Sequence, residues 1–169
     1  VIHGIVKKHE GAIVCQTTPG KGTVFDIYLP ELKTITEIPA RPLDGEVVTG
    51  SGTILFVDDE PSLAAIASEM LKTLGYNVVA ETSSMKAFEL FMENPEAYDL
   101  VITDMTMPGM TGDRLAEKLR SVRNELPVII CTGYSERLSD ERINELGISR
   151  LCMKPIELKT MAEVIHEVL

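Results

Sequence analysis

From residue 53 onward, short apolar runs alternate with amphipathic stretches along the chain. Apolar residues in the longer stretches recur every three or four positions, the spacing of an α-helix with one buried face. The first of these helices begins at Pro61 and carries four apolar side chains that we expect to be buried: Leu63, Ile66, Met70 and Leu74. The short apolar runs between helices are expected to be strands, at residues 53–57, 77–81, 99–103, 127–132 and 149–153.

Five strand–helix repeats predict an α/β fold in which helices cover both faces of a parallel sheet. The runs 53–57, 99–103 and 127–132 are apolar throughout rather than alternating, as expected for strands buried on both faces. We therefore expect a doubly wound, five-stranded, flavodoxin-like sheet with strand order 2-1-3-4-5 and five helices.

The first fifty residues have a different pattern. A helical stretch ends at Gly11, and two strand-like runs, 12–17 and 23–30, flank a turn with the sequence PGKG. Apolar and polar side chains alternate in the second run, which predicts an antiparallel hairpin with one solvated face. Residues 32–51 contain prolines, glycines and scattered polar residues without periodicity, as linkers do.

The expected organisation is a helix and hairpin fragment at 1–31, a linker at 32–51 and the main domain at 52–169. The first residues start as if within an element and lack a signal-peptide pattern, which indicates a piece of a longer polypeptide. Whether a parent protein is anchored in a membrane stays open, since no apolar run here has the length of a membrane span.

The net charge of −10 is concentrated in residues 51–169, which hold 20 acidic and 11 basic groups. Nucleic acids and anionic membranes bind clustered Lys and Arg, so neither is expected as a direct partner. The three cysteines have no metal-type spacing, and an odd number is a poor disulfide framework. They are interpreted as reduced thiols of a cytoplasmic protein.

Polar side chains stand at the ends of four of the predicted strands: Asp58 and Asp59, Asp104, Thr132 and Lys154. Carboxyl ends of parallel strands meet at one edge of a sheet, where ligands bind. Clustered carboxylates repel one another, and a hard divalent cation such as Mg²⁺ relieves that repulsion. Together with an ammonium and a hydroxyl group, they are suited to holding a phosphoryl group during transfer.

Asp104 is the candidate nucleophile, because it stands alone at a strand end before a loop with two glycines and a proline. A carboxylate can attack phosphorus and form an acyl phosphate. The adjacent Asp58 and Asp59 are better placed to hold the metal.

Residues 53–169 resemble a receiver domain of two-component signalling, the response regulator module. The resemblance rests on VDDE, DLVITDMTMPGMTG, PVIICTG and MKP, which occur in the family's order and at its intervals. It implies that Asp104 is the phosphoacceptor and that Thr132 and Lys154 contact the phosphoryl oxygens. It also implies a cis bond between Lys154 and Pro155.

The same resemblance implies how Mg²⁺ is held: by Asp59, Asp104 and the backbone carbonyl of Thr106, with Asp58 acting through water. One position departs from the family pattern. Leu151 stands where receivers usually carry an aromatic residue whose rotation reports phosphorylation, which leaves that readout an open question here.

Residues 1–31 resemble the C-terminal end of a histidine-kinase ATPase domain, in which a helix leads into the last hairpin and a Gly-Lys-Gly-Thr turn lies near the nucleotide. A receiver joined to a kinase by a short linker is the arrangement of bacterial hybrid histidine kinases. The catalytic core of that kinase would lie upstream, so the receiver itself is not expected to turn over a substrate. The expected partner is the phosphohistidine of a kinase or phosphotransfer protein, and a homodimer is left open.

Two other functions remain. A phosphatase of the haloacid-dehalogenase type also uses an aspartate nucleophile and Mg²⁺, and Asp104-Met105-Thr106 loosely fits its nucleophile loop. That family places its acidic pair after the nucleophile, whereas Asp58 and Asp59 precede it. The third alternative is a pure interaction domain, which the complete set of polar strand-end residues argues against.

Overall fold

The structure is a computed structural model that describes residues 2–30, 48–133 and 139–169. The chain divides into two compact units, Val1–Asp44 and Gly45–Leu169, which are described one at a time. Most of the linker predicted at 32–51 lies outside the described residues.

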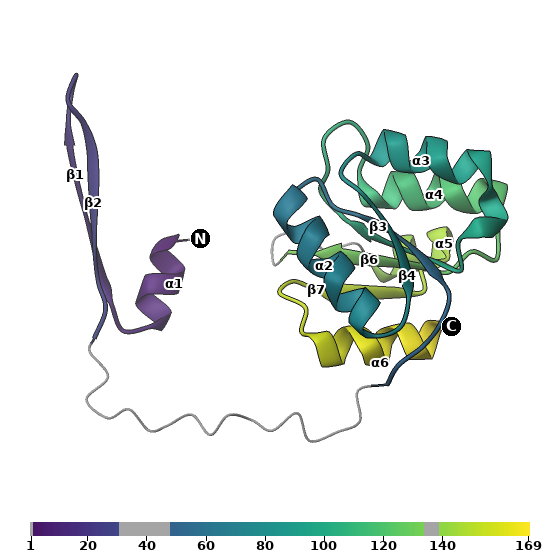
Figure 1. Ribbon diagram of the computed structural model, residues 1–169. Coiled ribbons are helices and arrows are strands. Elements are labelled where there is room, and N and C mark those ends of the chain that lie inside the picture. Colours follow the sequence, from purple (N-terminus) through teal and green to yellow (C-terminus); the bar gives the residue numbers. More distant parts are fainter. Residues whose placement is uncertain (1, 31–47, 134–138) are drawn as a thin grey trace. The chain divides into compact units, whose positions relative to one another are not determined.

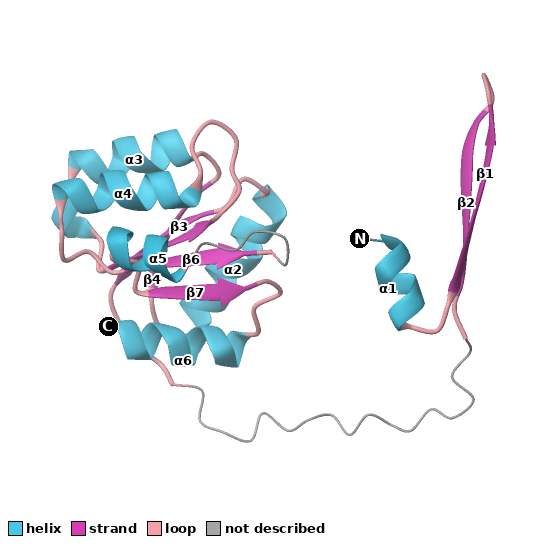
Figure 2. Cartoon of the chain, turned by 180° about the vertical axis from the view of Figure 1, so that it is seen from behind, coloured by secondary structure: helices cyan, strands magenta, loops and turns pink. Residues whose placement is uncertain are grey.

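The larger unit is built on a parallel sheet of five strands: β3 (Thr53–Val57), β4 (Asn77–Glu81), β5 (Leu100–Asp104), β6 (Val128–Thr132) and β7 (Arg150–Met153). Their order across the sheet is β4-β3-β5-β6-β7, which confirms the predicted order 2-1-3-4-5. The arrowheads of β6 and β7 point the same way in Figure 2. All five carboxyl ends therefore lie along one edge.

Helices cover both faces of this sheet, as predicted: α2 (Pro61–Thr73), α3 (Ser84–Glu93), α4 (Gly112–Val122), α5 (Asp140–Leu146) and α6 (Leu158–Val168), with a short 3₁₀ helix η1 (Pro95–Ala97). Figure 1 shows α3 and α4 together on one face and α2 and α6 on the other. Gly147 caps the C-terminal end of α5, and its φ of 60° is the left-handed conformation that glycine adopts without strain.

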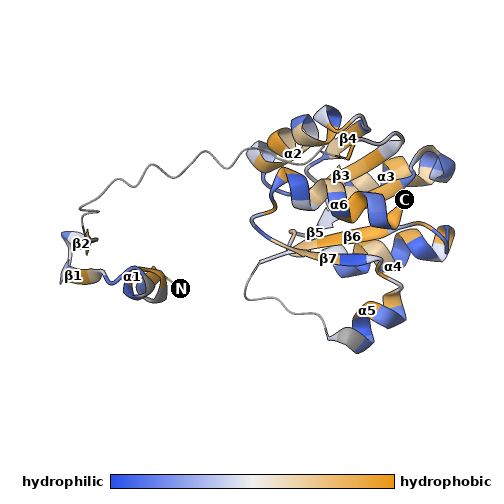
Figure 3. Cartoon of the chain, turned by 90° about the horizontal axis from the view of Figure 1, so that it is seen from below, coloured by the Kyte–Doolittle hydropathy of each residue, from blue (hydrophilic) through white to orange (hydrophobic). Residues whose placement is uncertain are grey.

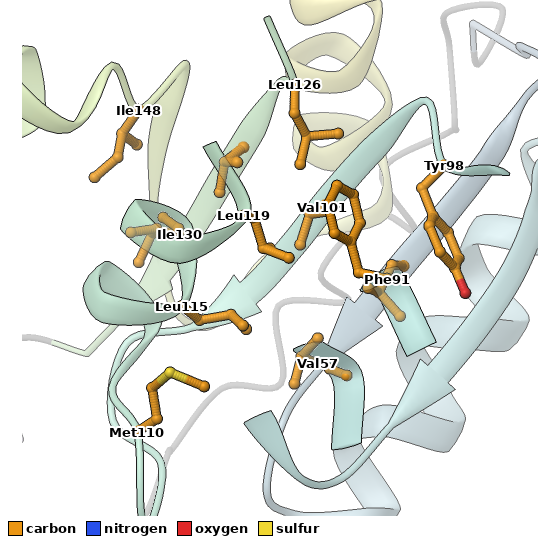
Figure 4. Packing of buried hydrophobic residues seen from close by; sticks show 14 of the residues in the cluster. Val57, Phe91, Tyr98, Val101, Met110, Leu115, Leu119, Leu126, Ile130 and Ile148 are labelled. Atoms are coloured by element: carbon orange, nitrogen blue, oxygen red, sulfur yellow. The ribbon is translucent and has the colours of Figure 1, made fainter. Parts of the chain in front are cut away.

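Two apolar clusters fix these helices on the sheet. One joins the strands to α3, α4 and α5, and Figure 4 shows Phe91 and Leu119 packing toward Val101 within it. The other joins the opposite faces of the strands to α2 and α6. The central strands β5 and β6 are buried along their whole length, which explains their continuous apolar sequences. The hydrophobic colour of β6 is visible in Figure 3.

The prediction of which side chains α2 buries is wrong in part. Leu63 is 39% exposed and Ile66 is 58% exposed, although Leu74 is fully buried. The helix instead buries small residues, Ala64 and Ser68, together with a leucine one turn later. Small side chains let a helix approach the strands closely, so the larger apolar residues are rotated toward its flank.

The smaller unit contains α1 (Ile2–Lys8) and an antiparallel hairpin of β1 (Ala12–Thr18) and β2 (Gly22–Tyr28), as the sequence predicted. Val6 of α1 is buried, and a side chain at Gly11 would collide with Tyr28 and Leu29. The large apolar residues of β2 are exposed within this unit. None of the helices in the described ranges is both long and apolar enough to cross a membrane.

Candidate functional site

Backbone hydrogen bonds align the residues at the carboxyl edge of the sheet. The amide of Lys154 donates to the carbonyl of Thr132 at 2.9 Å, which continues the β6–β7 pairing past the strand ends. The amide of Asp58 donates to the carbonyl of Glu81 at 3.1 Å and does the same for β3 and β4. Asp104 is the last residue of β5, between these two pairs. The polar residues thus occupy neighbouring strand ends.

Lys154 joins two of the predicted carboxylates. Its Nζ lies 2.6 Å from Oδ2 of Asp58 and 2.6 Å from Oδ1 of Asp104. The side chains are 28% exposed for Lys154, 3% for Asp58 and 11% for Asp104. Because the pairs are shielded from water, their attraction is stronger than that of ion pairs on the surface.

The second oxygen of each carboxylate is held by a backbone amide. Glu60 N–H donates to Oδ1 of Asp58 at 3.0 Å, and Thr106 N–H donates to Oδ2 of Asp104 at 3.0 Å. Hydrogen bonds to ionised acceptors are roughly twice as strong as neutral ones. Both carboxylates are therefore fixed in direction before any ligand arrives.

The other predicted site residues lie around this cluster. Asp59 is exposed at the end of β3, next to the buried Asp58, and the side chain of Thr106 is exposed in the loop after β5. Thr132 is buried, and its hydroxyl donates to the carbonyl of Gly133 at 3.2 Å. The bond between Lys154 and Pro155 is cis, which confirms that expectation.

In the part of the chain that the structure describes, no three His, Cys, Asp or Glu side chains are grouped as a metal site. Asp58 and Asp104 face the Lys154 ammonium instead, and Asp59 is not part of that contact. The donor set nevertheless fits a hard divalent cation, since carboxylate oxygens of neighbouring strands converge on one positive charge. In this structure the positive charge between the carboxylates of Asp58 and Asp104 is the Lys154 ammonium.

The pKa of Lys154 reflects opposing effects. Burial lowers it, but the hydrogen bonds and negative charges of Asp104 and Asp58 outweigh burial and raise the pKa above its usual 10.5. Lys154 therefore keeps its positive charge at neutral pH.

Gly112 is a residue of this site whose role sequence reasoning missed. A side chain there would collide with the backbone carbonyl of Asp104, and the Gly112 amide donates to the carbonyl of Met105 at 2.9 Å. The start of α4 can approach the end of β5 this closely only without a Cβ atom. The Thr-Gly pair at the start of α4 was visible in the sequence, but the contact depends on the three-dimensional packing.

A cavity of about 460 Å³ adjoins the site on the side of α2 and α6. Asp58, Lys154 and Cys131 contribute to its lining. The remaining lining residues are apolar: Phe56, Leu63, Ile66, Ala67, Met70, Leu71, Pro155, Ile156 and Met161. The exposed flank of α2 therefore faces this cavity.

Comparison with known proteins identifies the fold's family. The response regulator receiver domain family matches residues 54–166. Over 177 aligned residues the chain is 30% identical to the sensor kinase CckA of Brucella abortus, and the alignment covers 100% of this chain. It covers 19% of that relative, so the chain spans about a fifth of its length.

Solved structures agree. The receiver domain of the hybrid histidine kinase CckA is 32% identical, with a TM-score of 0.59 over 70% of this chain and 99% of that one. The response regulator TrrA of Thermotoga maritima, solved in complex with Mg²⁺ and BeF, is 29% identical with a TM-score of 0.63 over 70% and 99% of the two chains. The chain therefore belongs to the response regulator receiver domain family and is a receiver of a two-component phosphorelay, homologous to those of hybrid histidine kinases.

Proposed function

We propose that Asp104 of this receiver accepts a phosphoryl group from a phosphohistidine. The observation that carries the proposal is the contact of the Lys154 ammonium with Asp104 and Asp58 at the carboxyl edge of the sheet. Asp104 keeps a fixed direction through the Thr106 amide, so one carboxylate oxygen is oriented for attack. An acceptor with a cation 2.6 Å away is suited to a reaction that brings more negative charge to it.

In the transfer, a carboxylate oxygen of Asp104 attacks phosphorus, a P–O bond forms, and the P–N bond to the donor imidazole breaks. The imidazole leaves with the bonding electron pair and takes up a proton from solvent. Lys154 then pairs with a phosphoryl oxygen in place of the free carboxylate, and the Thr132 hydroxyl donates to another. Asp58 keeps the ammonium positioned at the site during the exchange.

Mg²⁺ is the cofactor that the donor set fits. Asp59, Asp104 and the backbone carbonyl of Thr106 would bind it, with Asp58 acting through water. When bound, the ion neutralises the carboxylates and the incoming phosphoryl oxygens. Receivers as a family bind this ion, and the complex of the Thermotoga TrrA relative contains it with a BeF group.

Incubation of the purified chain with acetyl phosphate and Mg²⁺ tests the acceptor. We expect one phosphate per chain by intact mass, released by hydroxylamine as acyl phosphates are. Asp104→Asn should abolish the addition, while the control Asp26→Asn, in the smaller unit, should retain it. Phosphate retained by Asp104→Asn would refute the assignment.

A turnover enzyme is not favoured, because the match to the receiver family covers residues 54–166 and the acidic pair precedes Asp104. Multiple turnover of a phosphomonoester would be the result that restores a phosphatase function.

We infer further that residues 1–31 are the end of a kinase ATPase domain, so that the parent protein is a hybrid histidine kinase. Support comes from the similarity to CckA, which covers this segment as well as the receiver, and from its helix and hairpin. The exposed Phe25, Ile27 and Leu29 form an apolar row that the rest of such a domain would cover.

The three cysteines are free thiols, which supports a reducing compartment such as the cytoplasm.

The native polypeptide that contains this chain tests that inference. We expect it to phosphorylate itself from ATP on a histidine and to pass the phosphate to Asp104. A native polypeptide without an ATP-binding core before Val1 would contradict it.

A further inference from the structure

Two cysteines lie directly opposite each other in the sheet, next to the phosphoacceptor site. Cys131 of β6 and Cys152 of β7 are register partners in this parallel pair. Register partners point to the same face, and both residues belong to the apolar cluster under α2 and α6. Cys131 is 2% exposed and Cys152 is 5% exposed. Phosphoryl transfer as proposed uses neither thiol.

Their backbone positions are within the range of a disulfide. Neighbouring strands lie about 4.8 Å apart, and the Cα atoms of disulfide-bonded cysteines are usually about 4.4–6.8 Å apart. The Cβ atoms of a disulfide are closer, at about 3.8 Å. Bond formation therefore requires β6 and β7 to draw together locally by about 1 Å, without any change of register.

A small oxidant has a route to one of the two thiols. Cys131 contributes to the lining of the cavity of about 460 Å³ beside α2 and α6. Cys152 sits directly across from it on the edge strand of the sheet. Oxidation can thus begin at Cys131 and be resolved by Cys152 without unfolding the sheet.

We propose that Cys131 and Cys152 are a thiol pair that peroxide oxidises to a disulfide, and that this disulfide slows phosphoryl acceptance at Asp104. The effect on phosphoryl acceptance rests on the proposed function. The Cys131 thiolate attacks a hydroperoxide, so an S–O bond forms, the O–O bond breaks, and water or an alcohol leaves after protonation. The Cys152 thiolate then attacks the sulfenic sulfur, the S–S bond forms, and hydroxide leaves as water. Two thiols are oxidised and one peroxide is reduced.

The disulfide would act on the site through short stretches of backbone. Thr132 directly follows Cys131, and Lys154 is two residues after Cys152. The carbonyl of Cys131 also accepts a hydrogen bond of 2.8 Å from the amide of Met105, in the acceptor loop. Because a displacement of about 1 Å can change a reaction rate by about 100-fold, drawing the strands together is expected to disturb transfer.

Burial makes the pair slow to react. It raises the pKa of both the Cys131 and the Cys152 thiol, so thiolates are scarce at neutral pH. The pair therefore stays reduced under ordinary conditions and responds only to sustained oxidant.

The chemical step is tested with hydrogen peroxide on the full chain carrying Cys15→Ser, which removes the exposed third thiol. After quenching and alkylation under denaturing conditions, we expect a mass loss of two hydrogen atoms and no free thiol. Tryptic digestion should give a disulfide-linked pair of the peptides 124–137 and 151–159. Unreacted thiols, sulfinic acid or disulfides between chains would each overturn the proposal. Cys152→Ala in the same background should give no cross-linked peptide.

The functional step compares reduced and oxidised protein in phosphorylation by acetyl phosphate with Mg²⁺. We expect the oxidised form to be at least about tenfold slower and dithiothreitol to restore the rate. Cys152→Ala should be phosphorylated at the same rate before and after peroxide, which separates the disulfide from other oxidation. Equal rates for the reduced and oxidised forms would refute the switch, whereas a reduced protein that accepts no phosphate would refute the proposed function instead.

Discussion

Lys154 and Asp58 are 96 positions apart in the chain, yet Nζ of Lys154 donates a hydrogen bond of 2.6 Å to Oδ2 of Asp58. The same nitrogen lies 2.6 Å from Oδ1 of Asp104. Three different strands thus deliver one cation and two anions to a single point. This arrangement provides charge neutralisation before a metal or a phosphoryl group arrives, and its energetic consequences can be measured.

Removing the ammonium should weaken the fold and strengthen the response to Mg²⁺. Lys154→Met leaves two shielded carboxylates without their cation, and hydrogen bonds to charged groups contribute about 1.5–3 kcal/mol each. We expect the free energy of unfolding in urea to fall by about 3–6 kcal/mol, because two such contacts are lost. Mg²⁺ should then raise the melting temperature of the variant more than that of the wild type, because the ion no longer competes with the ammonium.

Lys159→Met is the matched control, since the exposed Lys159 has a surface contact of 4.0 Å with Glu163. Its unfolding free energy should change by less than about 0.5 kcal/mol. Equal stabilisation of wild type and Lys154→Met by Mg²⁺ would show that the lysine and the metal ion do not compete for the same carboxylates.

The stability that Lys154 provides should disappear only at alkaline pH. The partners raise its pKa in the folded protein above 10.5, so folding favours the protonated form. The stabilisation is fully present below the unfolded pKa and is lost as the pH rises through the folded one. The difference in unfolding free energy between wild type and Lys154→Met should therefore be constant from pH 7 to about 10 and shrink above it. A difference that shrinks below pH 9 would contradict the raised pKa.

Gly112 should be far less tolerant of substitution than Gly133. A Cβ atom at Gly112 would collide with the backbone carbonyl of Asp104, whereas one at Gly133 would meet no atom of the described residues within 4 Å. Overpacking against backbone costs about 1–3 kcal/mol, so Gly112→Ala should be destabilised by that amount in urea unfolding. Phosphorylation of Gly112→Ala should also slow, because the carbonyl belongs to the acceptor residue. Gly133→Ala is the control, and equal effects of both would refute the close contact.

The sequence predicted the sheet well, because each strand is a short apolar run whose length and composition suffice to identify it. The order 2-1-3-4-5 followed from strand–helix repeats and the uniform hydrophobicity of the runs at 53–57, 99–103 and 127–132. Structure confirms both. The convergence of Asp58, Asp104 and Lys154 could be anticipated for the same reason, since parallel strands share one carboxyl edge.

Two features could not be read from the pattern. Periodicity gives the faces of a helix but not which apolar residues meet the sheet, so the rotation of α2 toward Ala64 and Ser68 was missed. The residue types indicated that carboxylates surround a metal ion. In the structure the Lys154 ammonium lies between Asp58 and Asp104, and this contact depends on how far the lysine side chain reaches. Both depend on distances of a few ångströms between elements remote in sequence.

The orientation of α2 can be tested, because the sequence pattern and the structure disagree on which apolar residues this helix buries. If Ile66 were in the core, Ile66→Ser would create a buried cavity and cost several kcal/mol. Since Ile66 is 58% exposed and Leu71 is 1% exposed, we expect Ile66→Ser to change the free energy of unfolding by about 0.5 kcal/mol or less. Leu71→Ala should instead cost about 2–5 kcal/mol, the range for buried leucines. Urea unfolding followed by circular dichroism measures the free energy of unfolding of both variants. A larger decrease for Ile66→Ser than for Leu71→Ala would support the buried face predicted from the sequence.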